Sequence, residues 1–153
     1  MNMTKKILIL YGTETGNSEL LAMDAEKMAA DSGLDATING MDEVTVADMQ
    51  EHDNLIIVCS TWGDGEQPDN AIDLYEAATE AGDDDFSNLN FAVLALGDTA
   101  FDLFCEAGIQ WDDVLEQKGG NRINDRIDCD TDYDDEAEEW LEETISLFVE
   151  NGA

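Results

Sequence analysis

The stretch that decides the fold is a short apolar run followed at once by a turn rich in glycine and hydroxyl groups. It reads Ile7-Leu8-Ile9-Leu10-Tyr11-Gly12-Thr13-Glu14-Thr15-Gly16-Asn17-Ser18, and a segment with helical spacing follows it. A strand that leads through such a turn into a helix gathers backbone N–H groups around one point, where the helix N-terminus adds partial positive charge. The hydroxyls of Thr13, Thr15 and Ser18 can donate hydrogen bonds to the same anion. The pattern predicts either a phosphate cradle of neutral donors or a plain capped turn, since Thr, Asn and Ser also suit helix N-termini.

The stretch does not match the two most familiar phosphate-binding motifs. A nucleoside-triphosphate loop ends in Gly-Lys-Ser/Thr, and no lysine lies close to this turn in the sequence. The dinucleotide fingerprint G-x-G-x-x-G is also missing. Support for a ligand site must therefore come from the rest of the chain.

Composition predicts one globular domain over residues 1–153, because 43% of the residues are apolar and only one is proline. The three cysteines are odd in number and show no C-x-x-C spacing, and His52 is the single histidine. A disulfide framework, a zinc site and imidazole chemistry are therefore not expected. The apolar run near the start of the chain is too short for a secretory signal or a membrane span, so we expect a soluble cytoplasmic protein.

The net charge of −32, from 38 acidic and 6 basic residues, is extreme. It excludes a general affinity for nucleic acid and for anionic membranes. Two interpretations remain open. The acidic surface can steer the protein towards basic patches on partners, or it can reflect adaptation to a salty cytoplasm.

Strands and helices are expected to alternate along the chain. The expected strands are 5–11, 34–39 (at a sheet edge), 54–60, 90–96 and 122–127, and the expected helices are 17–32, 43–50 (a short helix or turn), 70–81, 103–118 and 134–150. Apolar spacing places Leu20, Leu21 and Ala25 on the inner face of the first helix, and Trp111 and Trp140 in the core. Alternation of this kind predicts an α/β fold, a doubly wound sheet of five parallel strands with helices on both faces.

Ligands in such sheets bind beyond the carboxyl ends of the strands. The loops after the first, third and fourth strands are the ones rich in glycine, threonine and aromatic residues. We therefore expect the helix-entry turn, residues 61–70 and residues 97–105 to converge on one site.

Three motifs in this order resemble the flavodoxins and the flavodoxin-like FMN domains of diflavin reductases. They are Gly12-Thr13-Glu14-Thr15-Gly16-Asn17-Ser18, Ser60-Thr61-Trp62-Gly63-Asp64-Gly65 and Leu94-Ala95-Leu96-Gly97-Asp98-Thr99-Ala100-Phe101-Asp102-Leu103-Phe104-Cys105. The similarity extends over essentially the whole chain and is strongest to the FMN module of sulfite reductase flavoproteins. It implies a short-chain member with strand order 2-1-3-4-5.

The resemblance also implies the site residues. Thr13, Glu14, Thr15, Gly16, Asn17 and Ser18 would surround the FMN phosphate, and Trp62 and Phe101 would stack on the isoalloxazine ring. Gly63, Asp64 and Gly65 would lie beside the N5 edge of the ring, Leu96, Gly97, Asp98, Phe104 and Cys105 would form the second wall, and Asp128 would lie near the ring. Thr61 would also bind the cofactor. Close relatives often carry Tyr where this chain has Phe101, which stacks comparably but lacks the hydroxyl. Acidic residues near the flavin would disfavour its anionic reduced form.

The function implied is that of an FMN-binding, low-potential electron carrier without catalytic or metal-ligating residues. It would pass single electrons from a flavoprotein reductase to an acceptor enzyme, both with basic docking faces, and act as a monomer. The alternative is an FMN-dependent NAD(P)H oxidoreductase that acts directly on a quinone, but two aromatic residues covering the ring would leave little room for a substrate. A receiver-like signalling domain of the same fold needs a lysine after the last strand, and no lysine follows Lys118.

Overall fold

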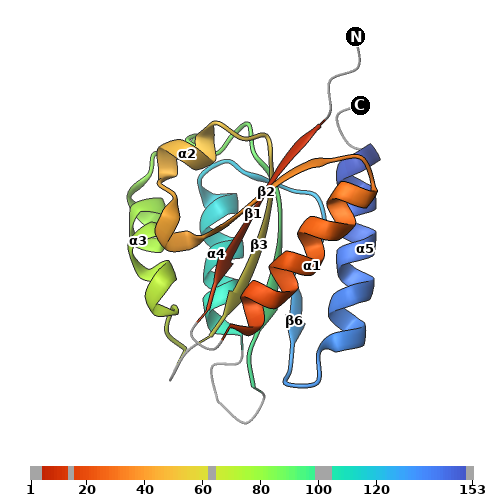
Figure 1. Ribbon diagram of the computed structural model, residues 1–153. Helices are drawn as coiled ribbons and strands as arrows, with labels where there is room; N and C mark the ends of the chain where they lie inside the picture. The colour runs from red at the N-terminus through yellow and green to blue at the C-terminus, as the bar shows by residue number, and fades with distance from the viewer. Residues whose placement is uncertain (1–4, 14–15, 62–64, 99–104, 151–153) are drawn as a thin grey trace.

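The computed structural model describes residues 5–13, 16–61, 65–98 and 105–150. Its centre is a parallel sheet (Figure 1), made of β1 (Lys6–Gly12), β2 (Asp35–Gly40), β3 (Asn54–Ser60), β4 (Asn90–Leu96), β5 (Asn121–Arg122) and β6 (Ile127–Cys129). The order is β2-β1-β3-β4-β5, and β6 also pairs with β4. Every pairing is parallel. The predicted doubly wound α/β fold and its strand order 2-1-3-4-5 are confirmed.

The prediction of one continuous last strand over 122–127 is wrong, because two short strands share its place. β5 pairs with the start of β4 and β6 with its end. Tertiary hydrogen bonds hold the residues between them. The side-chain amide of Asn124 donates to Thr144 Oγ1 at 2.9 Å, and the indole N–H of Trp140 donates to the carbonyl of Asp125 at 2.9 Å. The chain leaves the ladder at this point to bond to α5 (Asp134–Glu150).

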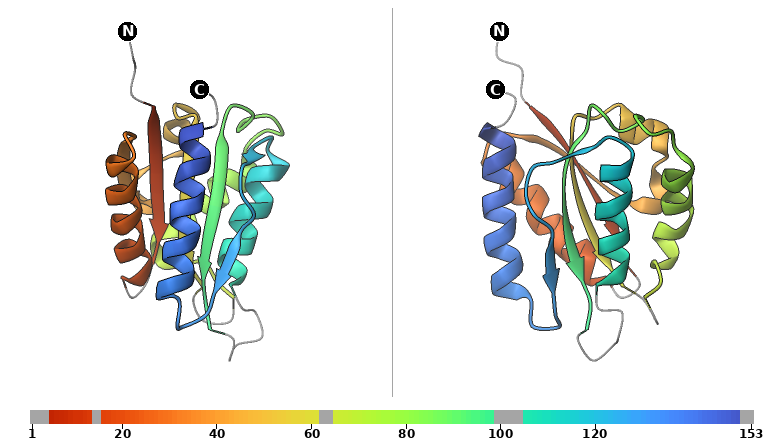
Figure 2. Two further views of the ribbon diagram at one scale, coloured as in Figure 1. Left: turned by 90° about the vertical axis from the view of Figure 1, so that its right-hand side faces the viewer. Right: turned by 180° about the vertical axis from the view of Figure 1, so that it is seen from behind.

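Helices cover both faces of the sheet (Figure 2). α1 (Asn17–Asp31) and α5 lie on one face, and α2 (Val46–Gln50), α3 (Ile72–Glu80) and α4 (Glu106–Gln117) lie on the other. Two short 3-10 turns, η1 (Met41–Glu43) and η2 (Asp69–Ala71), connect elements on this second face.

The sheet divides the buried apolar side chains into two clusters. The first packs α1 and α5 against one face, and the second packs α2, α3 and α4 against the other. Trp140 and Trp111 belong to these clusters as predicted. The inward placement of Leu20 is wrong, because its side chain is 61% exposed and Leu21 and Ala22 occupy the buried face instead.

The edge of the sheet where the strands begin is tied together by side chains. Asn121 donates to Asn90 Oδ1 at 2.9 Å, Asn90 donates to Asn54 Oδ1 at 3.3 Å, and Asn54 donates to the Lys6 carbonyl at 2.9 Å. At the same edge, Lys5 Nζ donates to the carbonyl of Phe148 in the last turn of α5 at 2.8 Å. The opposite edge, where the strands end, carries the loops that are expected to bind a ligand.

Candidate functional site

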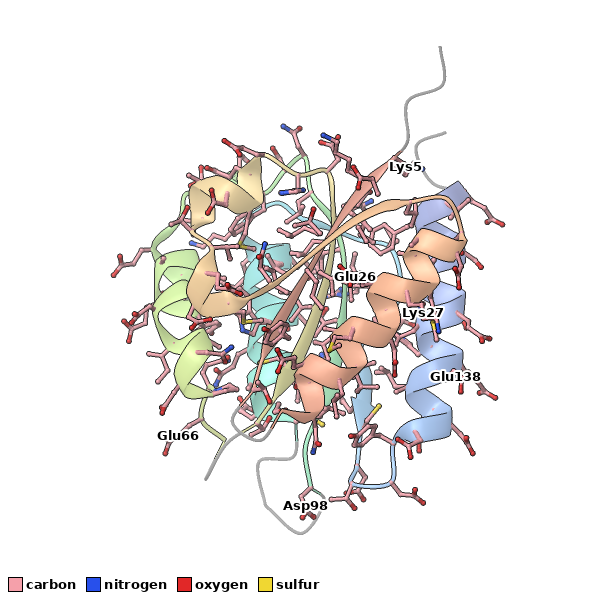
Figure 3. The ribbon with its side chains drawn as sticks, viewed as in Figure 1. Lys5, Glu26, Lys27, Glu66, Asp98 and Glu138 are labelled. Atoms are coloured by element: carbon pink, nitrogen blue, oxygen red, sulfur yellow. The ribbon has the colours of Figure 1, made fainter. Side chains whose placement is uncertain are left out.

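Three loops leave the sheet at its carboxyl edge. β1, β3 and β4 are neighbouring parallel strands, so their ends lie side by side at the lower edge in Figure 1. Thr61 follows β3 directly and donates its N–H to the carbonyl of Leu96, the last residue of β4, at 3.0 Å. Figure 3 shows Glu66 and Asp98 at this end of the molecule and Lys5 at the other. The predicted convergence of the helix-entry turn, the 61–70 loop and the loop after β4 is what the described residues show.

The start of α1 is suited to an anion. Gly16 precedes the helix with a positive φ of 94°, which glycine adopts without steric cost, and it has no side chain to cap the first-turn N–H groups. The hydroxyl of Thr13 accepts the N–H of Gly16 at 2.8 Å and so fixes the turn. The helix therefore presents uncapped donors and its positive end to whatever lies beyond it.

Ser18 joins this turn to β3. Its Oγ lies 2.6 Å from the Oγ of Ser60, the last residue of β3. Two hydroxyls that share one hydrogen bond keep one proton between them that can be donated elsewhere. Ser18 is fully buried, so it also fixes the spacing between the two loops.

Asn70 holds the end of β1. Its side-chain oxygen accepts the N–H of Thr13 at 2.8 Å, and its amide donates to the carbonyl of Tyr11 at 3.2 Å. The sequence places Asn70 at a helix start, where it would be interpreted as a cap. Instead it completes the β1 turn across 57 residues of chain.

Gln67 anchors the second loop to α4. It is only 8% exposed, and its amide donates to the Ala107 carbonyl and to Gln110 Oε1, both at 3.0 Å. Its oxygen accepts the indole N–H of Trp111 at 3.0 Å. Thr61 supports the same contact, because its hydroxyl accepts the N–H of Ala107 at 3.0 Å. Sequence reasoning missed Gln67, since a polar residue in a loop carries no local sign of burial.

Gly97 allows the backbone on the two sides of the third loop, at Gly97 and Cys105, to approach closely. A Cβ at Gly97 would lie 2.7 Å from the backbone nitrogen of Cys105, so a side chain does not fit there. The Gly97 N–H donates to the carbonyl of Cys129 at 2.9 Å. Cys105 is fully buried, and burial raises the pKa of its thiol to about 12. Its thiol therefore stays protonated and has no thiolate chemistry at neutral pH.

Asp128 lies on β6 beside Ala95 of β4 and is held by an arginine. Arg126 binds both of its carboxylate oxygens, with Nε at 2.7 Å from Oδ1 and Nη2 at 3.3 Å from Oδ2. The hydrogen bond that Arg126 donates to Asp128 raises the pKa of Arg126, so the guanidinium is charged at every relevant pH. Asp128 therefore lies at the edge of the site as one member of an ion pair.

The described residues include Thr13, Gly16, Asn17, Ser18, Thr61, Gly65, Leu96, Gly97, Asp98, Cys105 and Asp128, all on or beside the carboxyl edge. The other predicted site residues are Glu14, Thr15, Trp62, Gly63, Asp64, Phe101 and Phe104, and they lie outside the described residues. The stacking roles assigned to Trp62 and Phe101 thus stay predictions.

A groove of about 480 Å³ lies elsewhere, between α1 and α5. It is lined by Leu21, Asp24, Lys27, Met28, Asp31, Asp134, Glu138, Leu141 and Glu142. Among the described residues, no group of three or more His, Cys, Asp or Glu is arranged to hold a metal ion. Within the same residues, none of the helices has the length and apolar character needed to cross a membrane.

Comparisons with known proteins agree with the fold and the motifs. The flavodoxin family model matches residues 9–143. The sulfite reductase [NADPH] flavoprotein alpha-component of Bacillus subtilis is 41% identical over 97% of this chain, and that of Vibrio parahaemolyticus is 35% identical over 95%. The chain spans about a quarter of the length of these relatives, 25% and 23% respectively.

Solved structures give the same result. A flavodoxin from Streptococcus pneumoniae superposes with a TM-score of 0.85 at 28% identity, covering 94% of this chain and 97% of the other. Oxidised flavodoxin 2 from Bacillus cereus superposes with a TM-score of 0.78 at 29% identity, covering 95% and 98%.

The family match covers most of the chain, and the strand order and the three loops at the carboxyl edge agree with it. The chain therefore belongs to the flavodoxin family, whose members are electron-transfer proteins with FMN as their cofactor.

Proposed function

We propose that this protein carries single electrons between a flavoprotein reductase and an acceptor enzyme and has no substrate chemistry of its own. The observation that carries the proposal is the convergence of three loops on one edge, fixed to each other by Ser18–Ser60, Thr13–Asn70 and Thr61–Ala107 hydrogen bonds. FMN supplies the redox chemistry when bound, and the protein's part is to bind it, exclude water and set its potentials.

The described residues fit FMN at its phosphate end. Gly16 gives the start of α1 no side-chain cap, the hydroxyls of Thr13 and Ser18 lie at the same turn, and the hydroxyl of Ser60 on β3 bonds to that of Ser18. Such neutral donors suit a phosphate dianion in a strongly acidic protein. The N–H dipoles at the start of the helix stabilise the two negative charges of the phosphate, and no lysine is needed. We assign the phosphate to residues 13–18, the ring to Trp62 and Phe101, its edges to residues 61, 63–65 and 96–98, and supporting positions to Phe104, Cys105 and Asp128.

The relatives indicate the classes of partner. Their name describes an NADPH-dependent flavoprotein of sulfite reductase, so we propose an NADPH-oxidising flavoprotein as donor and a sulfite-reducing or similar redox enzyme as acceptor. With a net charge of −32, the protein would be steered towards basic faces on both partners. We further propose that residues 1–153 act as one domain, as a monomer, in the cytoplasm.

The first test is titration of the purified protein with FMN in molar salt, with riboflavin as the control ligand. We expect structured flavin absorption, quenched fluorescence, and binding of FMN at least about tenfold tighter than riboflavin, because charge-assisted hydrogen bonds hold the phosphate. A protein that ignores FMN, or that binds both ligands equally, would contradict the proposed phosphate site.

A matched pair of variants tests whether the phosphate binds at the turn before α1. Thr13→Val removes the hydroxyl that orients Gly16, so it should weaken FMN binding about tenfold and riboflavin binding much less. Thr79→Val removes a hydroxyl that bonds only within α3 and should leave both affinities unchanged.

A steady-state assay separates the carrier from an oxidoreductase. We expect no oxidation of NADPH by the holoprotein with a quinone alone, and electron transfer once a flavoprotein reductase is added. Rapid turnover without the reductase would contradict the proposed carrier function and favour an NAD(P)H oxidoreductase that acts directly on a quinone.

A further inference from the structure

Both arginines of the chain belong to one ion-pair network that runs from the candidate site to the far end of α4. Asp112 of α4 lies at its centre and is only 4% exposed. One of its oxygens accepts Arg126 Nη1 at 3.0 Å, and the other accepts Arg122 Nε at 2.8 Å. Arg126 continues to Asp128, and Arg122 continues to Glu116. A chain with only 6 basic residues thus commits two of them to this network.

The network follows β4, and both of its arginines bond to the one carboxylate of Asp112. Arg122 pairs with Phe91 near the start of the strand, whereas Asp128 pairs with Ala95 near its end. The next residue after Asp128 is Cys129, whose carbonyl accepts the Gly97 N–H of the third loop. The Asp128–Arg126 pair therefore lies at the site edge, whereas Arg122 lies beside Phe91, further from that edge, and pairs with Asp112 and Glu116.

The geometry makes Arg126 more than a surface partner of Asp128. Bidentate contact fixes the carboxylate in the plane of the guanidinium, and the buried Asp112 fixes the guanidinium from behind. The positive charge of Arg126 therefore offsets the negative charge of Asp128 at the site edge, in a molecule of net charge −32.

We propose that Arg126 is a positioning residue that cancels the charge of Asp128 beside the bound flavin. It thereby keeps the affinity for the anionic reduced flavin, and so the potential of the second one-electron step, higher than an unpaired Asp128 would allow. This inference rests on the proposed function, because it requires FMN at the carboxyl edge.

The test compares four variants of the FMN-loaded protein by spectroelectrochemical titration at low salt. Arg126→Gln adds one net negative charge at the site and should weaken binding of the fully reduced flavin, relative to the one-electron-reduced form, about three- to tenfold, where tenfold is about 59 mV. Asp128→Asn should shift the potential in the opposite direction. The double variant should return it to within about twofold of the wild type, since both charges are gone.

Arg122→Gln is the matched control. It also removes one partner of Asp112 and one positive charge, but it leaves the Arg126–Asp128 pair in place. We expect a smaller change in the reduced-flavin ratio than for Arg126→Gln. Shifts should shrink in molar salt, where the Debye length falls to about 3 Å.

A structural role alone gives a different result. If Arg126→Gln lowers stability but leaves the potential of the second step unmoved, the inference is wrong. If Arg126→Gln does not fold, Asp128→Asn still decides, because it leaves Arg126 paired with Asp112 alone and must raise that potential; an unmoved potential in Asp128→Asn would overturn the inference. Urea unfolding of the four apoproteins provides a readout without flavin. The stability lost in the double variant should differ from the sum of the losses in Arg126→Gln and Asp128→Asn, because the two residues form one ion pair. Failure of the wild type to bind FMN would instead overturn the proposed function.

Discussion

At the scale of single residues, the three cysteine thiols are held protonated by burial. Cys59, Cys105 and Cys129 are free and buried. Burial raises the pKa of Cys105 and of Cys129 to about 12 and also raises that of Cys59. The pKa values in the folded protein lie above the unfolded value of about 8.5. The contribution of the thiols to the free energy of unfolding is therefore fully present below about pH 8.5 and is lost as the pH rises towards 12.

We therefore expect the free energy of unfolding to fall between about pH 9 and pH 12, by about 1–2 kcal/mol per thiol at pH 10. Urea unfolding at several pH values measures this. A variant with Ala at all three cysteines should show a shallower loss over the same range, whatever its stability at pH 7. An equal slope in both proteins would mean that other groups, such as Tyr11 with its raised pKa, control the alkaline limb.

Local signals predict the start of α1, whereas the residues that support the loops carry no such signal. The helix start at Asn17 could be predicted because glycine and hydroxyl groups precede a segment with helical spacing. Gln67 and Asn70 could not, because each acts through partners 40 or more residues away in the sequence. The apolar spacing predicts that both Leu20 and Leu21 face inward, because adjacent leucines fit one apolar stripe, but only Leu21 is buried.

At the scale of elements, α4 lies close to the sheet because of one glycine. A Cβ at Gly108 would lie 2.2 Å from the Cβ of Ala95 in β4. Gly108→Ala should destabilise the protein by about 3 kcal/mol, since the helix must move away from the sheet. It should also weaken FMN binding, because the start of α4 holds Thr61. Chemical unfolding and flavin titration measure both effects.

Gly82→Ala is the control for that substitution. The new methyl group would meet only the carboxylate of Asp85, a side chain that can move. We expect a change within about 1 kcal/mol and unchanged flavin affinity. If Gly108→Ala behaved in the same way, the close approach of α4 to β4 would not be needed for the fold.

Most elements could be predicted because their apolar spacing is strong. β3, β4 and α5 match the expected ranges residue for residue. The break in the fifth strand could not be predicted, since its cause is the bonding of Asn124 and Asp125 to α5. Periodicity within a strand carries no information on such partners.

At the scale of the whole molecule, self-repulsion opposes folding. The chain carries 38 acidic residues, and none of the helices α1, α3, α4 and α5 has a basic residue in its last turn. We expect raising NaCl or KCl from dilute to molar concentration to stabilise the protein by about 3 kcal/mol, or roughly 10 °C in Tm. Thermal unfolding followed by circular dichroism measures this.

Sucrose at matched osmotic strength is the control for that experiment, because it stabilises without screening charge. A salt effect far above the sucrose effect would favour adaptation to a salty cytoplasm. Stability that does not change with salt would favour partner docking as the reason for the acidic surface.

The contact between Lys5 and the last turn of α5 has a practical consequence for attaching this protein to a surface. Lys5 bonds to the carbonyls of Phe148 and Val149, so both ends of the described chain lie at the edge opposite Asp98 (Figure 3). A linker on either side would hold the molecule upright on an electrode with its carboxyl edge towards the solution. Anchored in this way, the proposed flavin would be reached by diffusing partners, while direct tunnelling from the support would have to cross the length of the sheet.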